Sequence, residues 1–296
     1  MSDSNLVNTS RGTVECAVSV EGSAVLALHG AMGGYDQGLL LARTTIGEPG
    51  YRYVAPSRPG YLGTPMALGS KPEEQADLCA ALLDALAIGK AAVVAISGGG
   101  QCALQFALRH PDRCAALIMV SACSAPVQVR LPLRFYLMKL IAKVPPLAAA
   151  MRRKLTADPD AAARRAIPDP VLRARTLNDP EAGPLFRELQ LSTMDRMAER
   201  MPGTLNDIRQ SRLPFAYPLE RIAVPLLVVH GTADSAAPFA QGKALAAAVP
   251  GAQLLAIEGG EHVSIFTHRR EIRARICAFL GATSPPVSQS SQSSGR

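Results

Sequence analysis

Short apolar runs alternate along this chain with helix-like segments, and this alternation limits the possible folds more than any other feature. Strand-like runs lie at residues 14–20, 24–28, 51–55, 91–96, 115–120, 225–229 and 252–257. Helix-like segments lie at 73–88, 101–110 and 236–249, and a last one spaces Ile272, Ile276, Phe279 and Leu280 along one face. Almost continuously apolar strands separated by helices indicate an α/β fold with a mostly parallel sheet and helices on both faces.

The alternation stops in the middle of the chain. Residues 125–215 have no strand pattern and many prolines, so we expect a helical lid inserted between two parts of one core, 11–124 and 216–281. Residues 1–10 and the Ser- and Gln-rich 282–296 are predicted to be disordered.

Composition narrows the class of protein. A chain of 296 residues that is 48% hydrophobic and 19% charged can bury a large core. No stretch resembles a signal peptide or a membrane-spanning helix, so stable membrane insertion is not expected. Six cysteines without metal-binding spacing favour a reducing, cytoplasmic location and give no sign of a metal site. Aromatic residues make up only 4% and no nucleic-acid-binding module is recognisable, which argues against a nucleic-acid partner.

The most specific motif is the run Ala95-Ile96-Ser97-Gly98-Gly99, in which a strand leads into a serine and a helix leaves it. Small residues around such a turn let strand and helix approach closely and hold the serine oxygen exposed at its tip, which suits a nucleophile. The alternative is a glycine-rich turn that binds phosphate. The run lacks both the GxGxxG spacing and the lysine of a P-loop, so we favour the nucleophile.

A serine hydroxyl needs a base, and the base needs an orienting carboxylate. His262 follows the last predicted strand in a glycine-containing loop, and Asp234 follows the strand at 225–229. The order Ser97, Asp234, His262 is that of the nucleophile, acid and base of α/β-hydrolases. Alternatively, His262 is a surface histidine and Asp234 caps the helix that follows it; the two roles of Asp234 are compatible.

An acyl-transfer intermediate carries a negatively charged oxygen that backbone N–H groups can stabilise. Gly98 would supply one N–H, and the loop at 29–34 (HGAMGG) would supply the other. Ala31 is the first candidate in that loop and Met32 the second. An ordinary glycine turn is the alternative for the loop.

Taken together, HGAMGG, SRPGYLGT, AISGGG, HGTAD and GGEH resemble the α/β-hydrolase family, over residues 11–281. The resemblance implies an eight-stranded, mostly parallel sheet with an inserted lid, and neither metal nor organic cofactor. Within the family the chain is similar to lidded esterases, lactonases, peptidases and C–C bond hydrolases. It is unlike haloalkane dehalogenases and epoxide hydrolases, because Ser97 stands where their aspartate would be. It departs from the usual pattern at Ala95, where glycine is common, and at Ser57, where an acidic residue is common.

The expected function is therefore a serine hydrolase that cleaves an ester, a lactone or a related acyl bond through an acyl-enzyme at Ser97. A C–C bond hydrolase, or a ligand-binding protein on the same scaffold, is the alternative. The net charge of +7 falls within residues 125–215. This basic lid indicates either a small-molecule substrate that bears an acidic group or an ordinary solvated surface. The sequence does not indicate an oligomeric state.

Overall fold

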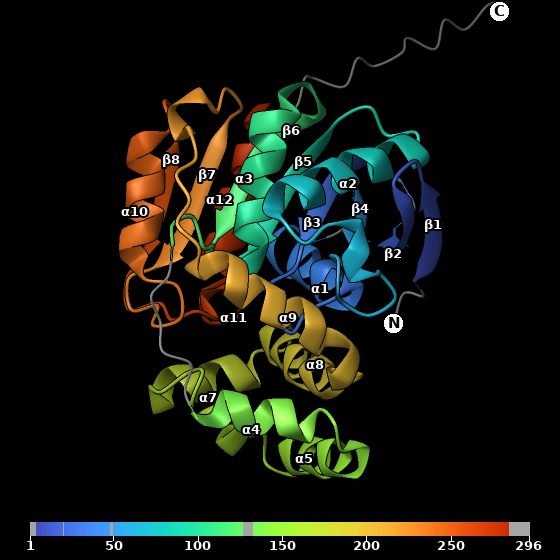
Figure 1. Cartoon of the computed structure of the whole chain (residues 1–296). Helices are drawn as coiled ribbons and strands as arrows, with labels where there is room; N and C mark the ends of the chain where they lie inside the picture. The colour runs from blue at the N-terminus through green and yellow to red at the C-terminus, as the bar shows by residue number, and fades with distance from the viewer. Residues whose placement is uncertain (1–3, 20, 48–49, 127–132, 284–296) are drawn as a thin grey trace, which may run out of the picture.

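A sheet of eight strands forms the centre of the molecule (Figure 1). The computed structural model describes residues 4–19, 21–47, 50–126 and 133–283. The strands follow the order β1-β2-β4-β3-β5-β6-β7-β8 across the sheet. Only the pairs β1–β2 and β2–β4 are antiparallel. The predicted α/β fold with an eight-stranded, mostly parallel sheet is confirmed. The strands are β1 (Asn5–Thr9), β2 (Gly12–Val18), β3 (Ser23–Leu28), β4 (Tyr51–Pro56), β5 (Ala91–Ile96), β6 (Cys114–Val120), β7 (Leu226–Gly231) and β8 (Gln253–Ile257).

Helices cover both faces of this sheet. Alternate residues of a strand point to opposite faces, so Leu26 and Leu28 of β3 join one apolar cluster, while Val25 and Ala27 join the other. The first cluster is completed by α2 (Pro72–Ala85), α3 (Gly100–Arg109) and α10 (Phe239–Ala248). The second is completed by α1 (Tyr35–Thr45), α11 (Ser264–Thr267) and α12 (Arg269–Thr283). Short 3₁₀ helices lie at Met66–Leu68, Ser97–Gly99, Pro111–Arg113 and Leu219–Arg221. Within the described residues, no helix has both the length and the apolar character needed to cross a bilayer.

The prediction of disorder for residues 1–10 is wrong where the structure describes them. Residues 5–9 form β1, an edge strand that makes a hairpin with β2. A tight turn at Ser10 and Arg11 joins the strands, and Gly12 leaves it with φ of +122°. β1 has one partner strand and a mostly exposed surface, so it lacks the continuous apolar run of a central strand. At the other end, α12 continues to Thr283, two residues past the predicted boundary, and the rest of the predicted tail lies outside the described residues.

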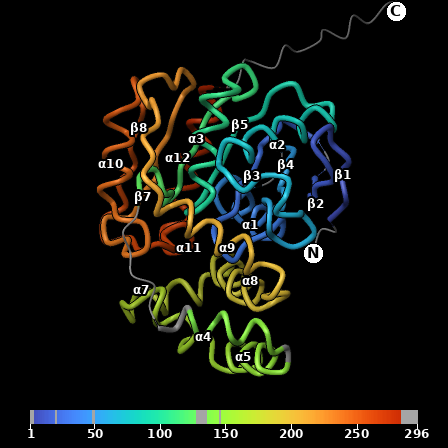
Figure 2. The backbone as a smooth tube through the Cα atoms, viewed as in Figure 1, coloured from blue at the N-terminus to red at the C-terminus, as the bar shows by residue number. Residues whose placement is uncertain are grey.

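In the described part of the chain, six α-helices lie between β6 and β7, although these two strands are neighbours in the sheet. We call them the helical insertion, and they fall inside the segment predicted as a lid. They are α4 (Leu133–Ile141), α5 (Pro145–Ala157), α6 (Pro159–Ala163), α7 (Pro170–Asn178), α8 (Ala182–Met194) and α9 (Met197–Arg212). Figure 1 shows them gathered below the sheet. Figure 2 traces the chain through this segment and labels α4, α5, α7, α8 and α9.

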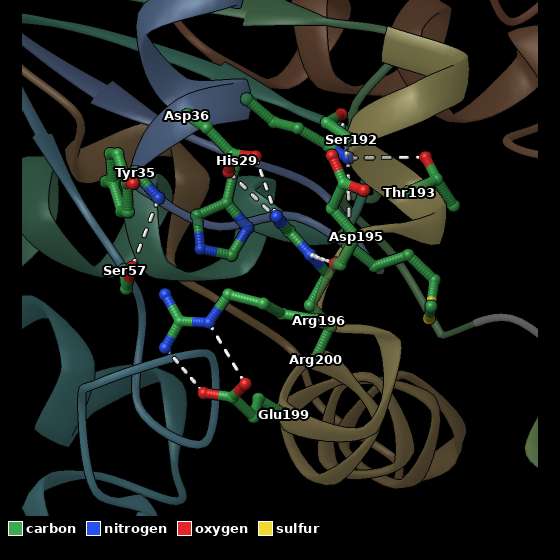
Figure 3. Close-up of polar contacts among 12 residues, drawn as sticks. His29, Tyr35, Asp36, Ser57, Ser192, Thr193, Asp195, Arg196, Glu199 and Arg200 are labelled. Carbon is green, nitrogen blue, oxygen red and sulfur yellow. Dashed lines mark hydrogen bonds and ion pairs between the residues drawn. The ribbon is translucent and has the colours of Figure 1, made fainter. Parts of the chain in front are cut away.

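Two buried ion pairs hold α9 against the core. Arg200 donates to both oxygens of Asp36 on α1, at 3.0 and 2.7 Å (Figure 3). Arg58, which follows β4, pairs in the same two-pronged way with Asp207 on α9, at 2.9 and 2.5 Å. Each arginine side chain is only 2% exposed, so separating it from its carboxylate would leave a buried, unpaired charge and destabilise the fold. These two pairs therefore fix the position of α9.

The loop after β4 keeps an acidic partner even though its first residue is Ser57. The Ser57 hydroxyl donates to Glu15 Oε2 at 2.8 Å and accepts the Tyr35 N–H at 3.1 Å (the latter contact is drawn in Figure 3). The neighbouring strand β2 therefore supplies a carboxylate to this loop.

Candidate active site

Ser97 lies at the tip of a strained turn between β5 and α3. Its φ is +52°, a left-handed conformation that a non-glycine residue adopts at a cost. A Cβ on Gly99 would lie 2.7 Å from the His29 carbonyl oxygen, and one on Gly100 would lie 2.8 Å from the Cys123 carbonyl oxygen. Both positions therefore require glycine. Ala95, one of the departures from the family pattern, is fully buried in β5.

His262 meets Ser97 from the loop that follows β8. Gly259 is the second residue of the turn that opens this loop, and its φ is +65°. The His262 Nε2 atom lies 3.1 Å from Ser97 Oγ, which is hydrogen-bonding distance. The imidazole is 28% exposed, so it can exchange protons with solvent or substrate.

Asp234 lies behind the imidazole, after β7. Its two carboxylate oxygens are 3.0 and 2.9 Å from His262 Nδ1, and its side chain is completely buried. Since a carboxylate can only accept here, the proton must be on Nδ1, which leaves the lone pair of Nε2 facing Ser97. Burial opposes the charge of Asp234, but the hydrogen bond and charge of His262 and the N–H of Ala237 lower its pKa below the ordinary value.

Asp234 also accepts two backbone N–H groups, as the capping alternative suggested. Its Oδ1 accepts from Ala236 and Ala237, both at 2.9 Å. However, α10 begins at Phe239 with Pro238 at the N-cap position, three residues later than predicted. Asp234 therefore stabilises the turn ahead of the helix, and this turn aims its carboxylate at His262.

Two cavities meet at Ser97. The large chamber, of about 500 Å³, lies between the sheet edge and the helical insertion, and His262 lines it. Its other walls are mostly apolar and include Met32, Leu41, Met138, Met151, Phe186, Leu189, Met194 and Phe266. The small pocket, of about 120 Å³, also has a mostly apolar accessible surface, to which Pro72, Cys102, Cys123 and Ile208 contribute, but six polar side chains line it as well: Arg58, Gln75, Gln101, Asp207, Gln210 and Ser211. Ala31 and Ser97 line both cavities.

Comparison with known proteins identifies the family. A sequence profile described as alpha/beta hydrolase fold matches residues 23–269. The chain belongs to the α/β-hydrolase fold family. A solved α/β-hydrolase fold protein from Nakamurella multipartita is 34% identical and superposes with a TM-score of 0.83, over 95% of this chain and all of the other.

Curated relatives of this α/β hydrolase are also hydrolases. An uncharacterized hydrolase of Bacillus subtilis is 35% identical over 112 residues, a match that spans only 38% of either protein. The 2-hydroxy-6-oxononadienedioate/2-hydroxy-6-oxononatrienedioate hydrolase of Burkholderia vietnamiensis is 24% identical, over 87% of this chain and 86% of the relative. An enol-lactonase from Burkholderia xenovorans shares the fold, with a TM-score of 0.66 at 18% identity over 94% of this chain and all of that one.

The loop after β3 brings Ala31 and Gly98 together. A Cβ on Gly30 would lie 3.0 Å from Ser97 Cβ, and one on Gly98 would lie 3.5 Å from the Ala31 nitrogen. The Met32 N–H, in contrast, already donates to Thr204 Oγ1 on α9 at 2.9 Å. An occupied N–H cannot serve a substrate oxygen without losing that bond, so the structure favours Ala31 over Met32 as the partner of Gly98.

His29 has a structural environment. It is fully buried, and its Nε2 accepts the Arg58 N–H at 3.0 Å while its Nδ1 donates to the Gly30 carbonyl at 2.7 Å. Burial and the nearby charge of Arg58 hold its pKa well below the ordinary value of 6.5. A neutral, fully bonded His29 therefore joins the loop after β3 to the loop after β4.

The small pocket contains polar residues that sequence reasoning did not single out. Asp207 Oδ2 accepts a hydrogen bond from Arg58 and another, at 2.6 Å, from the Tyr61 hydroxyl. It also lies close to the backbone of Gly98, since a Cβ built on that glycine would be 2.9 Å from this oxygen. Gln101, in the first turn of α3, is 6% exposed and its Nε2 has no hydrogen-bond partner. Arg58 and Tyr61 stand in the motif SRPGYLGT, but neither of them was assigned to the site from the sequence. Asp207 comes next to the serine by the folding of α9 over the sheet, which no local pattern reveals.

A metal site is not evident in the part of the chain that the structure describes. No group of three or more His, Cys, Asp or Glu side chains there is arranged to hold an ion. Ser97 Oγ and His262 Nε2 are placed to exchange a proton, and Asp234 holds the imidazole in position.

Proposed function

We propose that this protein is a serine hydrolase that cleaves a carboxylic ester, a lactone or a related acyl bond, with Ser97 as nucleophile, His262 as base and Asp234 as orienting acid. The main support is a chain of two hydrogen bonds. Ser97 Oγ lies 3.1 Å from His262 Nε2, and His262 Nδ1 is bonded to the buried carboxylate of Asp234. The strained conformation of Ser97 supports the same role, because it holds the hydroxyl out toward both cavities.

In the first half of the reaction, His262 Nε2 takes the proton of Ser97 while Oγ attacks the substrate carbonyl. The carbonyl oxygen becomes an oxyanion, which the N–H groups of Ala31 and Gly98 stabilise. The imidazolium, stabilised by ionised Asp234, then gives its proton to the leaving oxygen as that bond breaks. In the second half, His262 takes a proton from the water that attacks the acyl-enzyme, and it returns this proton to Ser97 Oγ as the carboxylic acid is released.

Rapid-mixing hydrolysis of p-nitrophenyl acetate tests this proposal. Wild type should release a burst of about one nitrophenolate per protein, followed by steady turnover. Ser97→Ala and His262→Ala should abolish the burst and lower kcat by about 10³-fold or more. His268→Ala, which changes a histidine outside the site, should stay close to wild type. Wild-type turnover by Ser97→Ala would overturn the proposal.

C–C bond hydrolysis is a second candidate, favoured by the similarity to the Burkholderia vietnamiensis hydrolase over most of both chains. That relative is named for a dioate substrate, which would need a positive charge in the site. Arg165 is the only Lys or Arg among the described residues that line the large chamber. Faster cleavage of a vinylogous 1,5-diketone carboxylate than of simple esters, with loss of this preference in Arg165→Leu, would favour this candidate.

A further inference from the structure

The position of His262 relative to the two cavities indicates which cavity receives the acyl group of a bound ester and which receives its leaving group. His262 lines the large chamber and does not line the small pocket. The leaving oxygen must lie within hydrogen-bond reach of Nε2 to receive its proton. The leaving group therefore extends into the large chamber, and the acyl group extends past Gly98 into the small pocket.

The small pocket offers a donor and an acceptor that can both serve a substrate. Gln101 Nε2 is a buried donor without a partner, in a side chain that lines the pocket. A buried donor left unsatisfied is costly, so a ligand atom that accepts from it would gain more than one bound at the surface. Asp207 lines the same pocket, and its Oδ2 lies beside Gly98.

The charge of this pocket argues against an acidic acyl group. The positive charge of Arg58 is balanced by a two-pronged pair with Asp207, and Tyr61 donates a further bond to the same carboxylate. A carboxylate entering the pocket would meet Asp207, and the described residues that line the pocket include no Lys or Arg besides the paired Arg58. A hydroxyl can accept from Gln101 and donate to Asp207, so it suits both partners.

We propose that the small pocket is an acyl subsite that selects a short, uncharged acyl group bearing a hydroxyl, while the large chamber takes an apolar leaving group. This inference rests on the proposed serine-hydrolase function and adds its substrate class. The volume ratio supports it, since about 120 Å³ accommodates a chain of a few carbon atoms and about 500 Å³ a much bulkier group.

Four p-nitrophenyl esters with the same leaving group test the orientation and the chemistry: butyrate, 3-hydroxybutyrate, octanoate and hemisuccinate. We expect kcat/KM for 3-hydroxybutyrate to exceed that for butyrate by about 5- to 10-fold, the value of one or two hydrogen bonds. Octanoate and hemisuccinate should fall about 10-fold or more below butyrate. Octanoate at or above butyrate would place the acyl chain in the large chamber and overturn the inference. No turnover of any of the four by folded protein would instead contradict the hydrolase proposal itself.

Gln101→Leu tests the role of the unpartnered amide. It should remove most of the preference for 3-hydroxybutyrate over butyrate. Gln105→Leu is the matched control, because Gln105 is a buried glutamine one turn along α3 that does not line the small pocket, and it should keep the preference. An unchanged preference in Gln101→Leu would show that the amide does not contact the acyl group.

Discussion

At the scale of single residues, the conformation of the turn at Ser97 depends on neighbours that lack a side chain. Ser97 has φ of +52°, and the backbone carbonyls of β3 and its loop approach Gly99 too closely for a methyl group. Crowding by backbone atoms cannot be relieved by a rotamer change. The strain at the serine is therefore maintained by the packing of α3 against β3.

Gly99→Ala should lower the free energy of unfolding by about 2 kcal/mol, because the new Cβ would meet the carbonyl oxygens of His29 and Leu28. Urea denaturation measures the change. Gly281→Ala in α12 is the control, since beyond its own helix backbone and chain neighbours the added Cβ would meet nothing within 4 Å, and it should be neutral or slightly stabilising. Equal stability of Gly99→Ala and wild type would contradict the close approach.

Asp234→Asn should lower kcat for p-nitrophenyl acetate by about 10³- to 10⁴-fold, because an amide can turn its N–H₂ toward Nδ1 and favour the wrong tautomer of His262. Glu258→Gln, which removes an exposed carboxylate from the loop of His262, should change kcat less than about twofold. A loss below about 10-fold in Asp234→Asn would mean that another group orients the imidazole.

At the scale of elements, α9 connects the helical insertion to the site. It contributes Asp207 to the small pocket and Arg200 to the pair with Asp36, and its Thr204 occupies the Met32 N–H. Other arginines of the insertion form ion pairs with carboxylates of the insertion itself, as in Arg152–Asp195 and Arg173–Asp160. These pairs join residues of the same segment and are already counted in its net charge of +7, so an excess of basic side chains remains after pairing.

Asp207→Ala should lower the free energy of unfolding by about 3 kcal/mol, since it leaves the buried Arg58 guanidinium with a much weaker set of partners. Chemical denaturation followed by circular dichroism measures the loss. Glu188→Ala removes an exposed pair with Arg43 and should cost less than about 1 kcal/mol. Similar losses in the two variants would contradict the distinction between buried and exposed pairs.

Elements with strong local patterns were predictable from sequence. The run at 91–96 is apolar because β5 is buried on both faces, and the turn at Ser97 is recognisable because its glycines are adjacent in the chain. β1 was missed because an edge strand needs no continuous apolar run. Asp207 was missed because its pairing with Arg58 joins residues 149 positions apart. Ser97, His262 and Asp234 are also distant from one another, but each follows a strand end, and a parallel sheet brings such ends to one edge.

At the scale of the whole molecule, buried histidines make stability depend on pH. Burial lowers the pKa of both His29 and His230 below the ordinary value of 6.5. The unfolded chain therefore binds protons near pH 6 that the folded protein does not, and folding stability falls as the pH drops below about 6.5. The cytoplasmic location expected from the cysteines stays a prediction, and a near-neutral compartment would suit this pH dependence.

Between pH 7 and pH 5, the free energy of unfolding should decrease with a slope of up to about 1.4 kcal/mol per pH unit for each such histidine. His29→Gln should reduce that slope, whatever its effect on stability at pH 7. His110→Gln changes a half-buried histidine paired with Asp77 and serves as the comparison. Stability that is flat or rises toward pH 5 in wild type would contradict neutral, buried histidines.

The most direct test of the whole account is intact-mass spectrometry after incubation with a fluorophosphonate, which labels serines that are activated as nucleophiles. Wild type should gain the mass of a single adduct, peptide mapping should locate it at Ser97, and Ser97→Ala should gain none. An adduct on both proteins would mean that another residue is the nucleophile. No adduct on folded wild type would mean that Ser97 is not activated, and a ligand-binding role on this scaffold would then replace the hydrolase.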